Sequence, residues 1–129
     1  MKTIILAAAA LATTAAASPP QYPNAPVMVD RIRADCPLTI SFGSYAMGID
    51  GPSFDKVVRT LRYDRAVRGV EQHNWGREGE RTLCANIRKP AEARRVFNRL
   101  KVLLPAKPRG PVTLKLASGR EYRAPSGRR

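Results

Sequence analysis

Apolar and polar residues alternate in three segments of the chain, 38–42, 81–87 and 112–116. A period of two is the pattern of a half-buried β-strand, because successive side chains point to opposite faces. The apolar positions are Leu38, Ile40, Phe42, Leu83, Ala85, Ile87, Val112, Leu114 and Leu116. The sequence therefore predicts three strands, each with one face toward a common core.

A fourth segment, 65–75, alternates less cleanly. One parity holds Val67, Gly69, Glu71, His73 and Trp75, and the other holds Arg68, Val70, Gln72 and Asn74. Neither set is purely apolar, which favours a strand at the edge of a sheet. Residues 76–79 begin and end with glycine, so they predict the turn that joins this strand to 81–87 as a hairpin.

Helical periodicity is found in 53–63 and 90–104, where apolar residues recur three and four positions apart. The two apolar stripes are Phe54, Val57, Val58 and Leu61, and Ala93, Val96, Phe97 and Leu100. Ser53 is the expected cap of the first helix, and Asp55 falls in its expected first turn. Pro90 opens the second helix, where a missing N–H is tolerated.

The expected order of elements is strand, helix, strand, strand, helix, strand. This order is typical of the split βαβ, ferredoxin-like arrangement (βαββαβ) of the α+β class. We expect a four-stranded antiparallel sheet packed on two helices, with 38–42 and 81–87 as central neighbours. Ser118-Gly119 is a hairpin turn signal, so 121–124 is the candidate for an extra C-terminal strand.

Residues 1–17 have the features of a signal peptide. Lys2 supplies a positive start, 4–12 form an apolar run, and the alanines before Ser18 are the small residues that precede cleavage. Such a run is too short to span a bilayer as a stable helix, so no transmembrane segment is expected in the mature chain. This interpretation places the mature chain in the periplasm or outside the cell.

The rest of the chain divides by composition. Residues 18–35 form a proline-rich leader, 36–124 a single α+β domain and 125–129 a flexible basic tail. Prolines in the leader disfavour both helix and sheet ladders. A chain of 129 residues suffices for one domain of this kind.

Cys36 and Cys84 are the only cysteines, and in an exported chain we expect them to form a disulfide. Closing a loop of about 50 residues stabilises a fold by roughly 4 kcal/mol in the chain-entropy treatment. Alternation puts Cys84 off the main apolar face, so the bond is expected at the rim or on the open face of the sheet. The alternative, a redox or metal pair, lacks a C-x-x-C motif and has His73 as its only other soft ligand. No metal or other cofactor is expected.

Charge narrows the choice of partners. The chain has 23 Lys and Arg against 10 Asp and Glu, a formal charge of +13. This balance suggests an anionic partner such as a nucleic acid, a lipid headgroup, an anionic polysaccharide or an acidic protein face, and the alternative is a solvated basic surface. RNA-recognition modules share the expected strand order but need stacking aromatics on the third strand. Because 81–87 contains none, specific nucleic-acid recognition is not expected.

Candidate chemistry gathers on the hairpin. Glu71 and His73 share a predicted strand face with Trp75, which would suit general acid–base catalysis, and the alternative is an ordinary polar face. Glu78 and Glu80 alternate with arginines, which predicts local ion pairs.

The sequence thus favours binding over catalysis. We expect a small exported, basic, disulfide-stapled binding module of the cell envelope that contacts a protein or an anionic surface component. Trp and Arg are frequent anchors of interfaces, so the predicted binding surface is Arg68, Glu71, His73, Trp75, Arg77 and Arg81. The alternatives are an inhibitor or chaperone-like module for an exported enzyme, and a small hydrolase-type enzyme that uses Glu71 and His73.

Overall fold

A computed structural model describes residues 8–9 and 25–125 of the chain. The predicted signal peptide, apart from residues 8 and 9, the first part of the predicted leader, and the predicted tail after Pro125 lie outside the described residues.

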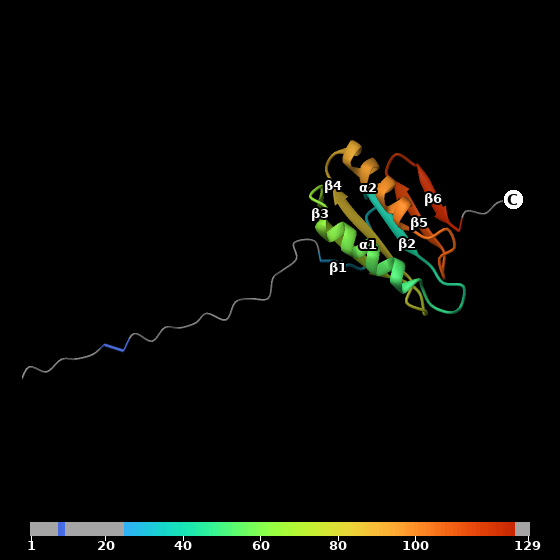
Figure 1. The fold of residues 1–129 in the computed structure, drawn as a ribbon, viewed down its shortest axis with the longest axis horizontal. Helices are drawn as coiled ribbons and strands as arrows, with labels where there is room; N and C mark the ends of the chain where they lie inside the picture. The colour runs from blue at the N-terminus through green and yellow to red at the C-terminus, as the bar shows by residue number, and fades with distance from the viewer. Residues whose placement is uncertain (1–7, 10–24, 126–129) are drawn as a thin grey trace, which may run out of the picture.

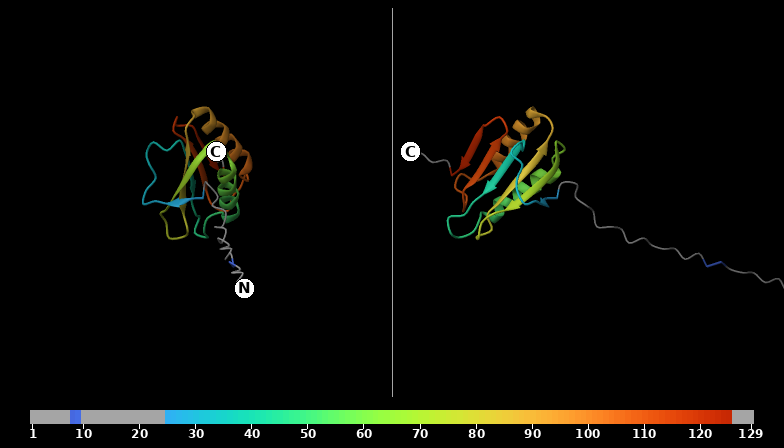
Figure 2. Two further views of the ribbon diagram at one scale, coloured as in Figure 1. Left: turned by 90° about the vertical axis from the view of Figure 1, so that its left-hand side faces the viewer. Right: turned by 180° about the vertical axis from the view of Figure 1, so that it is seen from behind.

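In the part of the chain that the structure describes, six strands and two helices form two layers (Figure 1). The strands are β1 (Val27–Met28), β2 (Leu38–Phe42), β3 (Val67–Asn74), β4 (Arg81–Ile87), β5 (Val112–Leu116) and β6 (Glu121–Ala124), and the helices are α1 (Gly51–Tyr63) and α2 (Pro90–Leu103). The strands lie in the order β1-β3-β4-β2-β5-β6. Both helices cover the same face of the sheet (Figure 2).

The predicted α+β class is confirmed, but the sheet differs from the expected four-stranded antiparallel one. It has six strands and is mixed, because β1 pairs with β3 in parallel. The prediction that β3 lies at an edge is therefore wrong. β1 comes from the proline-rich leader, where the prolines obscure any strand pattern. At the other edge β6 pairs with β5, at the position expected for a C-terminal strand.

A β-bulge near Arg68 changes which residues of β3 face the helices. Val67 lies opposite Ile87, but Gly69 lies opposite Asn86, so two residues of β3 span one step of β4. After this extra residue, Val70 joins Val67 on the core face. Simple alternation placed those two residues on opposite faces, and it was wrong because a bulge leaves no clear sign in the sequence.

Helix α1 begins earlier than expected. Its cap is Asp50 rather than Ser53, and the Asp50 carboxylate accepts the Ser53 N–H at 3.1 Å and the Arg109 N–H at 3.1 Å. Asp55 consequently falls outside the first turn. Burial raises the pKa of Asp50, but these two backbone N–H donors, together with the Ser53 side chain and the charge of Arg109, outweigh it, so the pKa lies below its ordinary value of 3.8. Asp50 thus ties the start of α1 to the segment before β5.

The core lies between the helices and the sheet. Every apolar position predicted for the three clear strands is buried there, together with both helix stripes except Val58, which is partly buried. Phe42 of β2 meets Phe54 of α1 edge to face, with ring centroids 5.2 Å apart. Burying one such large apolar side chain contributes roughly 1.5–3 kcal/mol, so this layer holds the helices in place.

The predicted disulfide between Cys36 and Cys84 is present, with Cα atoms 5.9 Å apart and a sequence separation of 48. Cys84 pairs with Thr39 and Glu71 across the ladder, on the face of the sheet away from the helices. The segment between β1 and β2 crosses that same face (Figure 2, left). The disulfide therefore fastens this segment to the middle of the sheet.

Candidate functional site

The predicted binding residues do not form one surface. Arg68 lies near the start of β3 and Trp75 just after its end, and a strand of this length spans roughly 25 Å. Trp75, Arg77 and Arg81 lie at one end of the sheet and Arg68 at the other, with Glu71 and His73 between them on the face opposite the helices. The structure therefore offers two separate ends as candidate sites.

Glu71 and His73 each contact the segment that crosses the open face. The Glu71 carboxylate lies 3.8 Å from Arg33 Nε, and His73 Nδ1 lies 3.3 Å from the Val29 carbonyl oxygen. Neither residue lines the hollows described below. Through these contacts both side chains help to hold the segment between β1 and β2 against the sheet. That Glu71 and His73 act as an acid–base pair stays a prediction.

At one end of the sheet, Trp75 is fixed but half exposed. Its Nε1–H donates to Thr82 Oγ1 at 3.0 Å, and its backbone N–H donates to the Glu80 carbonyl at 3.0 Å. The indole nevertheless keeps 52% of its surface exposed. The ring is thus held in a defined orientation with much of its surface available for contact.

A second loop, 43–50, lies beside this hairpin turn at the lower right of Figure 1. Ser44 Oγ donates to the Glu78 carboxylate and accepts the N–H of Gly48 at 2.9 Å. The loop presents Tyr45 and Met47, which are 59% and 93% exposed. We call the two loops, 43–50 and 75–80, the loop end.

The backbone of this loop is strained. Ala46, between Tyr45 and Met47, has a φ of 96°. A residue with a side chain rarely adopts such an angle, and strain of this kind gathers at functional sites. Sequence reasoning assigned no functional role to these residues and missed their exposure. The available signal was that two large apolar residues, Tyr45 and Met47, come just before the turn formers Gly48 to Pro52.

The charged residues of the hairpin turn differ from expectation. Arg81 stacks over the Phe54 ring, 4.6 Å from its centroid, and its Nε–H donates to the Gly79 carbonyl. Glu80 accepts the backbone N–H of Glu78 at 2.8 Å. In the described part of the chain the predicted ion pairs of these glutamates with the arginines are not formed, because the acids bond Ser44 and the backbone instead. Arg77 is exposed.

The opposite end of the sheet is hollowed where β4 runs into α2. Three neighbouring hollows, of about 440, 400 and 480 Å³, all include Ile87 and Arg88 in their walls. The first, which we call the apolar hollow, is lined by Asp35, Pro37, Ile87, Arg88, Pro90, Ala93, Arg94, Leu116, Ala117 and Ser118. The other two, the basic hollows, add Arg33, Arg65, Ala66, Arg68, Asn86, Lys89, Glu92 and Arg95.

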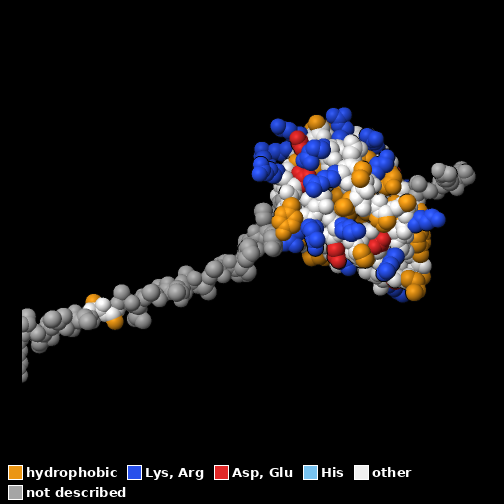
Figure 3. All heavy atoms as spheres, in the orientation of Figure 1, with side chains coloured by type: hydrophobic (Ala, Val, Ile, Leu, Met, Phe, Trp, Pro, Cys, Tyr) orange, Lys and Arg blue, Asp and Glu red, His pale blue; other side chains and the backbone are white. Residues whose placement is uncertain are grey.

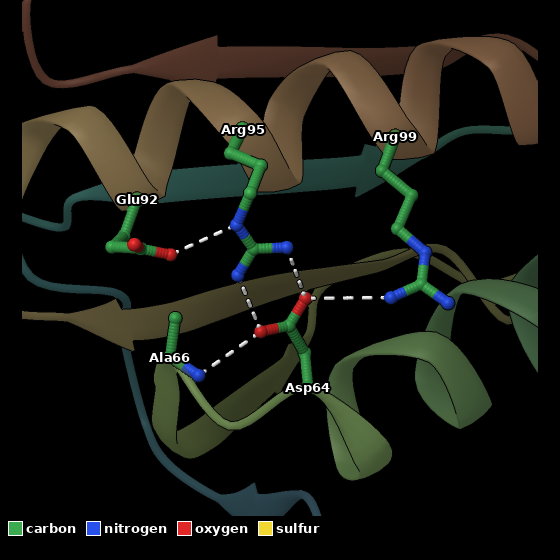
Figure 4. Close-up of polar contacts among 5 residues, drawn as sticks. All are labelled: Asp64, Ala66, Glu92, Arg95 and Arg99. Atoms are coloured by element: carbon green, nitrogen blue, oxygen red, sulfur yellow. Dashed lines mark hydrogen bonds and ion pairs between the residues drawn. The ribbon is translucent and has the colours of Figure 1, made fainter.

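An ionic cluster around Asp64 braces this end (Figure 4). Arg95 donates to both carboxylate oxygens of Asp64, at 3.0 and 2.8 Å, and Arg99 lies 3.5 Å away. The Ala66 N–H donates to Asp64 at 3.0 Å, and Glu92 accepts from Arg95 at 2.8 Å. This cluster, the Asp64 clamp, joins the end of α1 to α2.

The clamp shifts the titration of its members. Hydrogen bonds from Arg95 hold the pKa of Asp64 below its ordinary value of 3.8, although burial opposes the change. The same bonds raise the pKa of Arg95. The Asp64 side chain is only 3% exposed, so its negative charge lies inside the protein and is balanced there by Arg95.

Five further cations surround the hollows without such a partner. Among the described residues they form no ion pair with any acid, and all five are exposed: Arg65, Arg68, Arg88, Lys89 and Arg94. We call them the basic corner. Figure 3 shows Lys and Arg side chains gathered over this end, at the upper left. The two acids that line the three hollows already face arginines, Asp35 facing Arg33 and Glu92 facing Arg95.

Sequence reasoning found only Arg68 of the basic corner. The available signals were Arg65 with Arg68 at the start of one strand, and Arg88-Lys89 between another strand and Pro90. They converge because β3 and β4 are neighbours, as the predicted hairpin already implies.

No three His, Cys, Asp or Glu side chains within residues 8–9 and 25–125 are grouped as metal ligands would be. Over the same residues, no helix has the length and apolar character needed to cross a membrane. Comparison of the chain with protein-family models, curated proteins and solved structures gave no significant match.

Proposed function

We propose that the chain is a small exported binding module of the cell envelope that contacts a partner protein through its loop end. The observation that carries this proposal is the exposure of three large apolar side chains on two adjoining loops. Tyr45, Met47 and Trp75 are 59%, 93% and 52% exposed. Aromatic residues, Met and Arg are enriched at protein interfaces, and Arg77 borders the group.

The loop end is also well prepared to bind. The hydrogen bond between Ser44 and Glu78 joins the two loops, and the one between Trp75 and Thr82 holds the indole. Loops that are already ordered lose less conformational entropy when they meet a partner. The proposed partner therefore has an apolar pocket for Met47 and the rings, with acidic groups facing Arg77.

The disulfide supports an extracytoplasmic location, since such bonds persist in oxidising compartments. The apolar run and small residues before Ser18 support export by a cleaved signal peptide. We also propose a split βαβ, ferredoxin-like core. Its support is that β3, β4, β2 and β5 are adjacent in that order, with each strand antiparallel to its neighbours in this set.

If the partner is an exported enzyme, the same surface makes the chain an inhibitor or chaperone-like module. The hydrolase alternative has less support, because Glu71 and His73 each contact the chain segment that crosses the open face.

The test is affinity capture from an envelope extract with chain 18–129 and two variants. Met47→Ser with Trp75→Ala should lower retention of one specific protein at least about tenfold, which is about 1.4 kcal/mol. Val102→Ser is the matched control, because Val102 is 87% exposed but lies on α2. Equal retention by the wild type, the loop-end variant and the control would refute the proposed surface.

A further inference from the structure

The cations of the basic corner form no ion pairs with acids in the part of the chain that the structure describes. The Asp64 clamp occupies Arg95 and Arg99, whereas Arg65, Arg68, Arg88, Lys89 and Arg94 face no acid among the described residues. Like charges held at one end repel one another, and an anion placed among them removes that repulsion. Guanidinium groups match the oxygens of phosphate or carboxylate with paired hydrogen bonds. This end of the molecule therefore favours an oxyanion.

The apolar hollow adds a second requirement. Its floor is made of Ile87, Ala93 and Leu116, which belong to the hydrophobic core and are only 3–5% exposed. Pro37, Pro90 and Ala117 complete the apolar walls. A hollow of about 440 Å³ with such walls fits an apolar group better than a hydrated one.

Arg88 connects the two requirements because it lines all three hollows. We propose that the basic corner binds an anionic amphiphile, with its oxyanion headgroup at Arg88 and its acyl chain in the apolar hollow. A nucleic acid or polysaccharide would fill the basic hollows and leave the apolar hollow empty. A neutral lipid would leave the cations without a counter-charge. This site is at the opposite end of the sheet from the loop end and does not depend on it.

The disulfide supports one wall of the site. Cys36 lies between Asp35 and Pro37, both of which line the apolar hollow and one basic hollow. Because Cys36 is bonded to Cys84 in the middle of the sheet, this wall is fixed to β4.

Dodecyl phosphate, kept below the concentration at which it forms micelles, is the direct probe, and calorimetry measures its dissociation constant. We expect it to bind at least about tenfold more tightly than inorganic phosphate. Dodecyl maltoside, which has the same chain and a neutral headgroup, should not compete. Equal binding of dodecyl phosphate and inorganic phosphate, or competition by the neutral detergent, would overturn the proposal.

Two substitutions separate the headgroup from the chain. Arg88→Glu should weaken dodecyl phosphate binding at least about tenfold, while Lys107→Glu, the same charge change at the other end of the sheet, should change it less than about twofold. Ala117→Trp fills the apolar hollow and should weaken dodecyl phosphate but not inorganic phosphate. Ala91→Trp is its control, since Ala91 is exposed and lines none of the three hollows. If each substitution changed the dodecyl phosphate affinity as much as its control does, the site would be refuted. Circular dichroism verifies that all four variants are folded.

Sedimentation with lipid vesicles distinguishes the source of the amphiphile. Binding to phosphatidylglycerol vesicles but not to phosphatidylcholine vesicles, lost in Arg88→Glu, supports the proposal with a bilayer lipid as the ligand. Binding of monomeric dodecyl phosphate without sedimentation supports it with a free amphiphile. A double-stranded oligonucleotide that binds more tightly than dodecyl phosphate, and is unaffected by Ala117→Trp, would overturn the proposal in favour of a polyanion.

Discussion

The two ends of the sheet present opposite surfaces on one scaffold. The loop end exposes the apolar side chains of Tyr45, Met47 and Trp75, on loops joined by the hydrogen bond between Ser44 and Glu78. The opposite end carries the basic corner. Beside these cations, the apolar surface lies inside the apolar hollow. Exposed apolar side chains can enter a pocket in a partner protein, whereas a charged hollow can accept a ligand that enters it. A formal charge of +13 is therefore compatible with one end of the sheet whose exposed side chains are largely apolar and another whose exposed side chains are largely basic.

The largest expected effect comes from the disulfide, which braces the basic corner but not the loop end. Replacing both cysteines, Cys36→Ala with Cys84→Ala, should lower the free energy of unfolding by roughly 4 kcal/mol. Urea unfolding measures this change. Dodecyl phosphate affinity should fall while capture of the loop-end partner persists under conditions where the variant is folded. A parallel loss of both activities would mean that the ends are not independent.

The Asp64 clamp gives the next effect. Asp64→Asn should lower the free energy of unfolding at about pH 7 by about 2 kcal/mol, a figure reduced for the half-exposed Arg95 partner. Asp55→Asn on the exposed side of α1 is the control and should change it by less than about 0.5 kcal/mol.

The same variant makes a prediction about pH. The pKa of Asp64 is lower in the folded chain than in the unfolded chain, so its contribution to stability is present above about pH 4. It is lost as the pH falls through the folded pKa. The difference in unfolding free energy between wild type and Asp64→Asn should therefore shrink at the lowest pH where both still unfold cooperatively. A constant difference would show that the clamp does not depend on ionised Asp64.

Stability and binding should separate at the loop end. Met47→Ser removes a side chain that is 93% exposed, so the free energy of unfolding should change by less than about 0.5 kcal/mol. Trp75→Ala should lower it by about 1 kcal/mol, because the hydrogen bond to Thr82 is lost. Urea unfolding compares the two. A large loss of stability in Met47→Ser would assign this residue a structural role instead.

The smallest expected effect is that of salt. Raising sodium chloride from about 50 mM to about 300 mM should weaken dodecyl phosphate binding several-fold, because exposed charges are screened. Capture through the loop end should change little, since apolar contacts dominate there. Calorimetry and capture at both salt concentrations measure the contrast, and an equal salt dependence at the two ends would contradict it.

The sequence predicted the elements better than the surfaces. Alternation in 38–42, 81–87 and 112–116 reports burial directly, so those strands were predicted. The disulfide was predicted because the sequence has two cysteines and the features of an exported chain. β1 was missed because two residues in a proline-rich segment carry no periodicity. The bulge at Arg68 was missed because it leaves no clear sign in the sequence. Its one extra residue reverses which face the residues before it point to.

The two candidate surfaces arise from the topology. Ser44 meets Glu78 because β2 and β4, which are distant in sequence, are neighbours in the sheet. Arg65 and Arg88 line the same hollow because β3 and β4 pair as a hairpin. The sequence placed Trp75 on the hairpin but left open whether it is exposed or packed over the sheet, and Tyr45 and Met47 belong to another loop. Charge counts alone therefore could not reveal which arginines remain without an acid.

The most direct test of two independent surfaces is an NMR titration of the labelled chain with monomeric dodecyl phosphate. Shifts confined to amides near Ile87 to Arg94, Arg65 to Arg68 and Leu116 to Ser118, with none in 43–50 or 75–80, are the expected result. Shifts centred on the loop end, or spread evenly over the sheet, would contradict the account.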